Sequence, residues 1–181
     1  DTPEDLSDNP SRLKISGNYL IVSDASDDFV ALYDISTAST PVFLGELVDS
    51  TNLNTPADYE VYGSHLYVLY GPIQTRKVSV FDISTPSNIT YVNRFNAFST
   101  SNIVLDGSLL YLSSLNDVDV LELSVTPTAP TSVSSYTKAN SSAGVMAMSG
   151  DYLYLASEEP SLESINKLVP TALVLNDLNS Y

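Results

Sequence analysis

The chain contains no cysteine and no tryptophan among its 181 residues. The absence of cysteine excludes disulfide bonds, zinc–thiolate sites, iron–sulfur clusters and cysteine nucleophiles. The sequence also lacks any run of about 18 apolar residues, so it predicts no transmembrane helix. A fold of this length must therefore be stabilised by its apolar core, and 43% of the residues are hydrophobic.

Basic residues are scarce, with 7 Lys and Arg against 22 Asp and Glu, for a net charge of −15. Such a surface repels phosphate backbones and anionic lipids, which excludes nucleic acid as a partner and disfavours membrane binding. Two interpretations of the acidity remain. It keeps the protein soluble as a solvated surface, or part of it binds divalent cations.

Charged residues make up only 16% of the chain, so Ser, Thr, Asn and Tyr supply most of its polar surface. This mixture is typical of β-rich extracellular proteins. Residues 1–10 form a polar arm without an initiator Met, a basic start or an apolar stretch. We expect a mature chain whose leader has been removed, or a trimmed one, located outside the cell or at its surface.

One pattern occurs four times, in which an apolar strand meets a Gly-polar dipeptide and a strand rich in Tyr, Leu and Val follows. The glycines are at positions 17, 63, 107 and 150, so the intervals are 46, 44 and 43 residues. A glycine followed by a small polar residue is typical of a tight hairpin turn with positive φ. Each pattern therefore predicts a β-hairpin.

Two further strands follow each of the first three hairpins, separated by a turn rich in Ser, Thr and Pro. Four antiparallel strands in about 44 residues have the size of one propeller blade. The sequence thus predicts an all-β fold, a β-propeller-like array of about four four-stranded antiparallel blades. The expected domain covers 11–181, and its units span about 11–54, 55–98, 99–142 and 143–181.

The fourth unit departs from this pattern after its hairpin. Residues 161–168 show weak helical periodicity where the other units have their third strand, and residues 172–175 are candidates for a closing strand. The third strand is therefore degenerate, or it is replaced by a short helix or loop. Terminal repeats commonly differ in this way because they cap an array.

The sequence of the repeat resembles that of the LVIVD-repeat family of β-propeller proteins on bacterial and archaeal cell surfaces. The likeness lies in Gly-Asn-Tyr-Leu-Ile-Val at 17–22, Tyr-Asp-Ile-Ser at 33–36 with Pro41, and Phe-Asp-Ile-Ser at 81–84 with Pro86. The third unit keeps it loosely as Leu-Glu-Leu-Ser at 121–124. The resemblance extends from residue 11 onward and implies a scaffold with binding surfaces, with no catalytic residues and no cofactor.

Several acidic residues follow the second strand of a unit and are candidate metal ligands. In the first unit these are Asp24, Asp27 and Asp28, whose carboxylates would suit Ca²⁺. The loop lacks the alternating Asp-x-Asp-x-Asp-Gly spacing of a single-loop calcium site, so solvated turn residues are the alternative. Asp34 and Asp82 precede a turn, and we expect them to accept hydrogen bonds from its amides.

Little in the sequence points to catalysis. His65 is the only histidine and lies beside a hairpin turn, so it has no marked partners for a Ser-His-Asp triad. No pair of acidic residues is marked out for glycosidase chemistry. The tyrosines of the second strands are expected in the core, with a sugar- or peptide-binding surface as the alternative. We therefore expect a protein that is not an enzyme.

Asn88 and Asn140 begin Asn-x-Ser/Thr sequons in predicted turns and are candidate glycosylation sites. Two functions remain open. The first is an extracellular or cell-surface binding and adhesion module that takes a protein or glycan ligand. The second is a structural subunit that binds copies of itself through edge strands and terminal arms, forming a homo-oligomer or filament.

Overall fold

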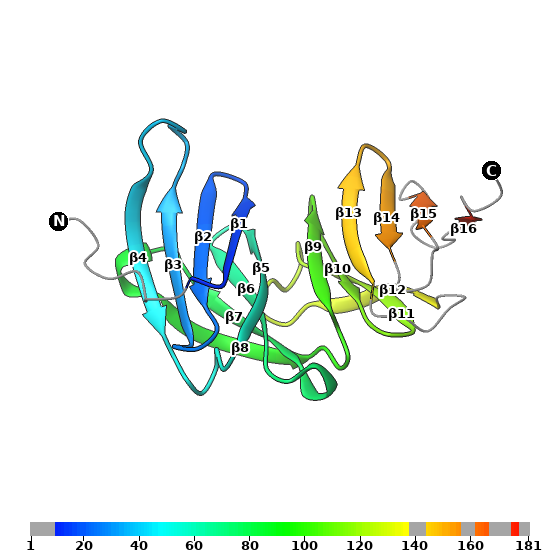
Figure 1. Ribbon diagram of the computed structural model, residues 1–181, viewed down its shortest axis with the longest axis horizontal. Coiled ribbons are helices and arrows are strands. Elements are labelled where there is room, and N and C mark those ends of the chain that lie inside the picture. Colours follow the sequence, from blue (N-terminus) through cyan, green and yellow to red (C-terminus); the bar gives the residue numbers. More distant parts are fainter. Residues whose placement is uncertain (1–9, 138–143, 157–161, 167–174, 178–181) are drawn as a thin grey trace. The chain divides into compact units, whose positions relative to one another are not determined.

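The computed structural model describes residues 10–137, 144–156, 162–166 and 175–177. Their strands form four antiparallel sheets of four strands each, and in every sheet the strands follow the order of the chain (Figure 1). The predicted array of four-stranded antiparallel blades is confirmed. In the part of the chain described, no helix is long and apolar enough to cross a membrane.

The first two sheets occupy residues 12–96. The first contains β1 (Arg12–Ser16), β2 (Tyr19–Asp24), β3 (Phe29–Asp34) and β4 (Val42–Val48). The second contains β5 (Pro56–Tyr62), β6 (His65–Tyr70), β7 (Lys77–Asp82) and β8 (Thr90–Asn96), with two short 3₁₀ helices, η1 (Ile73–Thr75) and η2 (Pro86–Asn88).

The other two sheets follow the same plan. The third contains β9 (Asn102–Asp106), β10 (Leu109–Ser113), β11 (Asp117–Glu122) and β12 (Thr131–Thr137). The fourth contains β13 (Val145–Ser149), β14 (Tyr152–Ala156), β15 (Leu162–Asn166) and β16 (Leu175–Asp177). The chain divides into two compact units, of which the first holds sheets one and two and the second holds sheets three and four.

Of the two alternatives for the third strand of the fourth unit, the degenerate strand is confirmed in the described residues and the short helix is wrong there. Leu162–Asn166 form β15, and every one of these residues is paired with a residue of β14. Pairing with an already formed hairpin outweighs a weak local preference for helix. The closing strand is β16, whereas residues 172–174 of the predicted closing strand lie outside the described residues.

The repeated glycines form the expected turns. In the first hairpin Ser16 pairs with Tyr19, which leaves a two-residue loop, and Gly17 has a φ of 59°. Gly63, Gly107 and Gly150 have nearly the same φ, between 53° and 59°. A positive φ at the first loop position is the type II′ arrangement, in which glycine avoids the clash that a Cβ would cause.

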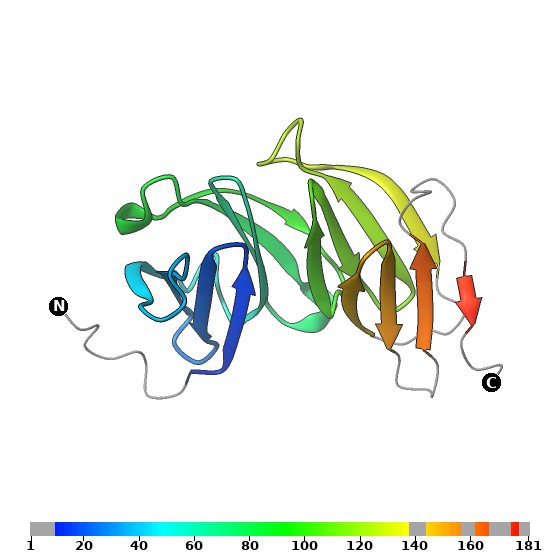
Figure 2. The ribbon, with the colours of Figure 1, turned by 90° about the horizontal axis from the view of Figure 1, so that it is seen from above.

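An apolar core holds the two sheets of each unit face to face (Figure 2). The second strands β2, β6 and β10 are buried over most of their length, whereas β14 is buried only at Leu153 and Leu155. The fourth strands β4, β8 and β12 are mostly exposed and alternate. This agrees with the near-continuous apolar runs and the alternating outer strands of the sequence.

Gly45 on β4 marks a close approach between the first two sheets. A Cβ at this position would lie 1.9 Å from the carbonyl oxygen of Pro86, which belongs to η2. The turn of the second sheet therefore rests directly on the backbone of the first. Only glycine leaves room for this contact.

Candidate functional site

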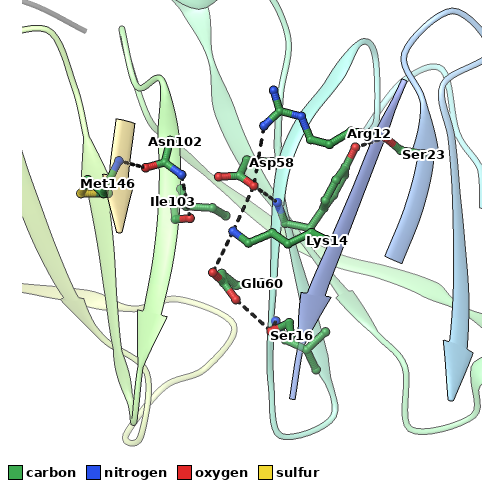
Figure 3. A network of polar contacts seen from close by, with 11 residues as sticks. Arg12, Lys14, Ser16, Ser23, Asp58, Glu60, Asn102, Ile103 and Met146 are labelled. Atoms are coloured by element: carbon green, nitrogen blue, oxygen red, sulfur yellow. Dashed lines mark hydrogen bonds and ion pairs between the residues drawn. The ribbon is translucent and has the colours of Figure 1, made fainter. Parts of the chain in front are cut away.

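Opposite charges meet where the first strands of sheets one and two, β1 and β5, lie side by side in the first unit (Figure 3). The Lys14 Nζ atom lies 3.0 Å from Asp58 Oδ1 and 2.8 Å from Glu60 Oε1. The Arg12 guanidinium lies 4.0 Å from Asp58 Oδ1. We call Arg12, Lys14, Asp58 and Glu60 the charged cluster.

The two carboxylates of the charged cluster are nearly inaccessible to solvent. The side chains of Asp58 and Glu60 are 3% and 8% exposed, whereas those of Lys14 and Arg12 are 23% and 49% exposed. Buried carboxylates are tolerated only when they are paired and hydrogen-bonded. The partly exposed cations therefore cover the anions on the solvent side.

Hydrogen bonds to neighbouring groups fix the geometry of the carboxylates. Ser16 donates its hydroxyl proton to Glu60 Oε2 over 2.8 Å and accepts the amide of Val61 over 2.9 Å. Asp58 Oδ1 also accepts the amide of Tyr59 over 3.0 Å. These bonds tie β1 to β5 and hold both carboxylates in one orientation.

The hydroxyl groups of Tyr59 and Ser23 are hydrogen-bonded behind the charged cluster. Burial raises the pKa of Tyr59 to about 12, although the hydrogen bond from Ser23 acts in the opposite direction. The phenol is therefore neutral at physiological pH. It serves as packing and as a hydrogen-bonding group rather than as a charge.

A third basic side chain lies near the charged cluster. Burial lowers the pKa of Arg76, the nearby Arg12 lowers it further, and Asp58 raises it. Arg12, Lys14 and Arg76, three of the seven Lys and Arg residues of this acidic chain, thus interact with Asp58, and Lys14 also pairs with Glu60. An arrangement of adjacent donors and acceptors suits a polar ligand, because each of its hydroxyl or charged groups can find a complementary partner.

Sequence reasoning missed the charged cluster, although the repeats contain a signal for it. Arg12 and Asp58 each lie five residues before the turn glycine of their unit, and Lys14 and Glu60 each lie three residues before it. Opposite charges at the same repeat position of adjacent units predict cross-strand pairs when the two first strands are neighbours.

Of the predicted calcium ligands Asp24, Asp27 and Asp28, Asp24 and Asp28 accept hydrogen bonds from backbone amides. Asp24 is buried at the end of β2, and its Oδ1 accepts the amide of Ser26 over 2.7 Å. Asp28, with a φ of 51°, accepts the amide of Thr55 over 2.8 Å. The described residues contain no group of three His, Asp or Glu placed to hold a metal ion. Calcium binding stays a prediction.

The expected turn role of the aspartates after the third strands is confirmed. Asp34 Oδ1 accepts the amide of Ser36 over 2.7 Å, and Asp82 Oδ1 accepts that of Ser84 over 2.8 Å. These backbone hydrogen bonds lower the pKa of both carboxyl groups. The Asp-Ile-Ser motif is thus a device that closes a turn.

The candidates His65 and Asn88 lie in the second sheet and its turns. His65 is half-buried at the start of β6 and pairs with Tyr62 and Asp82 in the sheet. Asn88 is exposed at the end of η2, as a glycosylation site requires, and Asn140 lies outside the described residues.

The tyrosines of the second strands divide between core and surface. Tyr67 and Tyr111 are buried, as expected for core packing. Tyr152 is 37% exposed, and its ring lies 6.3 Å from that of Tyr154.

Solved structures share this fold at low sequence identity. A protein of unknown function from Desulfotomaculum acetoxidans is 16% identical, with a TM-score of 0.68, and the match covers 93% of this chain and 57% of that one. A protein from Lactobacillus plantarum is 12% identical, with a TM-score of 0.67 and the same coverages. A Bacteroides fragilis protein, provisionally assigned as a 6-phosphogluconolactonase, is 17% identical, with a TM-score of 0.63, and the match covers 93% and 53%.

The chain therefore spans a little over half the length of these structures, and the likeness establishes the fold alone. No curated protein matches it in sequence. The model of the LVIVD repeat matches residues 9–49, which contain the whole first sheet and the Tyr-Asp-Ile-Ser motif. The likeness to the LVIVD repeat is thus shown for the first sheet, at residues 9–49.

Proposed function

We propose that the chain is a non-catalytic binding and adhesion module, located outside the cell or at its surface, and that its protein or glycan ligand contacts the charged cluster. The observation that carries this proposal is the pairing of Arg12 and Lys14 with the buried carboxylates of Asp58 and Glu60 in a chain of net charge −15. Surface charges on an acidic protein repel one another, so cations concentrated at one place favour a recognition role.

The geometry also favours binding over catalysis. Lys14 is engaged by both carboxylates, and Glu60 is held by Ser16. A general acid or base needs a titrating group free to exchange a proton with substrate. Groups that neutralise one another are better suited to hold a ligand than to transform it.

A glycan microarray and a panel of immobilised extracellular proteins test the proposal with the purified chain. Arg12→Ala removes the most exposed member of the charged cluster, and we expect it to weaken binding at least about tenfold. Arg94→Ala is the matched control, because Arg94 is an exposed arginine on β8. Equal binding by both variants would reject the charged cluster as the ligand site.

The catalytic alternative has a direct assay. Two of the structures that share the fold are provisionally assigned as 6-phosphogluconolactonases. We expect the chain to leave 6-phosphogluconolactone hydrolysis at the spontaneous rate. Acceleration that depends on His65 or on the charged cluster would refute the non-catalytic proposal.

Self-assembly through edge strands and terminal arms is a second candidate function. β4 is an edge strand of the first sheet, and its Val42 and Val48 are 57% and 63% exposed. An exposed apolar edge is a template for pairing with another chain. Light scattering of the purified protein tests this function, since a single species of 19.5 kDa would contradict it.

A further inference from the structure

The solvent side of the charged cluster is cationic. The side chains of Arg12 and Lys14 are partly exposed, whereas those of Asp58 and Glu60 are nearly inaccessible. A ligand that approaches from solvent therefore meets the guanidinium and the ammonium group before it meets either carboxylate. Complementary charge across a contact favours a ligand with a negative group at this place.

The two carboxylates are engaged by groups of the first unit itself. Glu60 Oε1 lies 2.8 Å from Lys14 Nζ, and Glu60 Oε2 accepts the hydroxyl proton of Ser16 over 2.8 Å. Asp58 Oδ1 accepts protons from Lys14 Nζ and from the amide of Tyr59, each over 3.0 Å. A donor group of a ligand would have to compete with these bonds. The site is better suited to a ligand group that accepts hydrogen bonds.

The Arg12 guanidinium is the group best placed to bind such an acceptor. Its ion pair with Asp58 spans 4.0 Å, which is longer than a hydrogen bond, so this contact uses none of its N–H donors. A guanidinium presents these donors as a planar fork that matches the two oxygens of a carboxylate. The Arg12 side chain is about half exposed, so a carboxylate can approach the fork from solvent.

The local charge limits how many negative groups the ligand can carry. Arg12, Lys14 and Arg76 carry three positive charges against the two negative charges of Asp58 and Glu60, so this region has a net charge of +1 and the rest of the chain has −16. Burial lowers the pKa of Arg76 most, and repulsion by Arg12 lowers it further. One carboxylate would relieve this repulsion and neutralise the excess charge, whereas the remaining surface would repel a polyanion.

We propose that the charged cluster binds the single carboxylate of a sugar acid at the end of an otherwise uncharged glycan, an inference that rests on the proposed binding function. Ser, Thr, Asn and Tyr supply most of the polar surface of the chain. Their side chains exchange hydrogen bonds with sugar hydroxyls and carry no charge. A glycan that ends in one uronic acid combines one carboxylate for Arg12 with hydroxyl groups for such a surface.

A titration of the ¹⁵N-labelled full chain, followed by chemical shifts, tests the proposal with two sugars. We expect methyl β-D-glucuronide to bind with a dissociation constant of about 1 mM, as is usual for so small a ligand, and to shift the amides of β1 and β5. Methyl β-D-glucoside has the same ring without the carboxylate and should bind at least about tenfold more weakly. Equal binding of the two sugars, or no shift with the glucuronide, would overturn the inference.

Replacements of Arg12 separate the planar fork from its charge. Arg12→Ala should abolish the preference for glucuronide over glucoside, and Arg12→Lys should keep only part of it, because the ammonium group has the charge without the fork. Arg94→Ala is the matched control and should bind like the unchanged chain. Circular dichroism checks that each variant is folded. A preference for glucuronide that survives Arg12→Ala would overturn the assignment of the carboxylate to Arg12.

N-acetyl-L-alanine distinguishes a sugar acid from a peptide, because it carries one carboxylate and no sugar. We expect it to bind at least about fivefold more weakly than the glucuronide. Binding as tight as that of the glucuronide would overturn the choice of a glycan and assign the site to a peptide carboxylate. The proposed function is decided separately, by whether the ligands found on the microarray and the protein panel depend on Arg12.

Discussion

A single ammonium group forms ion pairs with two buried carboxylates in the first unit. Lys14 reaches both Asp58 and Glu60, and its aliphatic stem crosses from β1 toward β5. A buried ion pair adds little net stability, because its attraction is offset by the cost of desolvation. Removing one partner is strongly destabilising, because it leaves the other charge buried without a counter-charge. The consequence is measurable.

Replacing Lys14 with leucine should lower the free energy of unfolding by about 3 kcal/mol, because it removes the ion pair of buried Glu60 and leaves Asp58 with the more distant Arg12. Urea denaturation followed by circular dichroism measures this change. Adding Asp58→Asn and Glu60→Gln to the same chain should recover most of the loss, since both negative charges are then absent. A loss below about 0.5 kcal/mol would show that water already compensates the carboxylates.

The turn aspartates should contribute to the dependence of stability on pH. The turn amides lower the pKa of Asp34 and of Asp82, so the folded state favours the ionised form. Their contribution is present above the unfolded pKa, near 3.8, and is lost as pH falls through the folded value. The melting temperature should therefore fall on acidification below about pH 4.

Asp34→Asn and Asp82→Asn together should reduce this acid loss, because asparagine accepts the same turn hydrogen bonds without titrating. Thermal melts at pH 6 and at pH 3 measure the difference. Asp151→Asn, which removes one carboxylate from the hairpin turn of the fourth sheet, is the control for each single replacement, Asp34→Asn or Asp82→Asn. An acid loss identical in all three proteins would mean that other carboxylates dominate.

Single residues differ in how far the sequence reveals them. The role of Asp34 and Asp82 was predictable, because a carboxylate before a turn bonds to amides two residues away. The cluster of Lys14 with Asp58 and Glu60 joins positions 44 and 46 residues apart, and it depends on which sheet face each strand presents. The sequence predicts this cluster only when adjacent units are aligned and their first strands are assumed to be neighbours.

At the level of elements, a turn of the second sheet limits which residue the first sheet can have at position 45. The carbonyl of Pro86 lies where a Cβ on Gly45 would be. In the second unit a hydrogen bond joins the first strands of the third and fourth sheets: Asn102 Oδ1 accepts the amide of Met146 over 2.8 Å. Sheets pack face to face, and a few such contacts set their register.

Gly45→Ala should destabilise the first unit by about 1 to 3 kcal/mol, because η2 must move away from β4 to admit the methyl group. Denaturant unfolding measures the loss, and hydrogen exchange of the amides of β4 and β8 locates it. Ser134→Ala is the control, because Ser134 holds the equivalent position on β12 and already carries a Cβ. Equal stability of the two variants would show that η2 yields without cost.

The hairpins were the most predictable elements, since the glycine that each turn needs recurs at nearly constant spacing. β15 was the least predictable, because Leu162–Asn166 lack the Asp-Ile-Ser ending and alternate weakly. Its strand state is imposed by pairing with β14, a long-range effect absent from local sequence.

At the scale of the whole molecule, an excess of 15 negative charges opposes compaction in both units. Salt screens such repulsion between exposed charges over about 10 Å at 0.1 M, whereas the buried pairs around Lys14 are screened much less. Screening of the repulsion stabilises the folded chain, whereas screening of the ion pairs destabilises it. With 22 acidic residues against 7 basic ones, relief of repulsion should dominate.

Raising NaCl from about 0.01 M to about 0.15 M should therefore stabilise the chain by about 1 kcal/mol, a rise in melting temperature of about 3 °C. Thermal melts followed by circular dichroism at pH 7 measure it. The same melts near the isoelectric point, about pH 4.1, are the control, because the net charge and its repulsion vanish there. A melting temperature that falls with salt at pH 7 would mean that the ion pairs of the charged cluster outweigh the repulsion of the acidic surface.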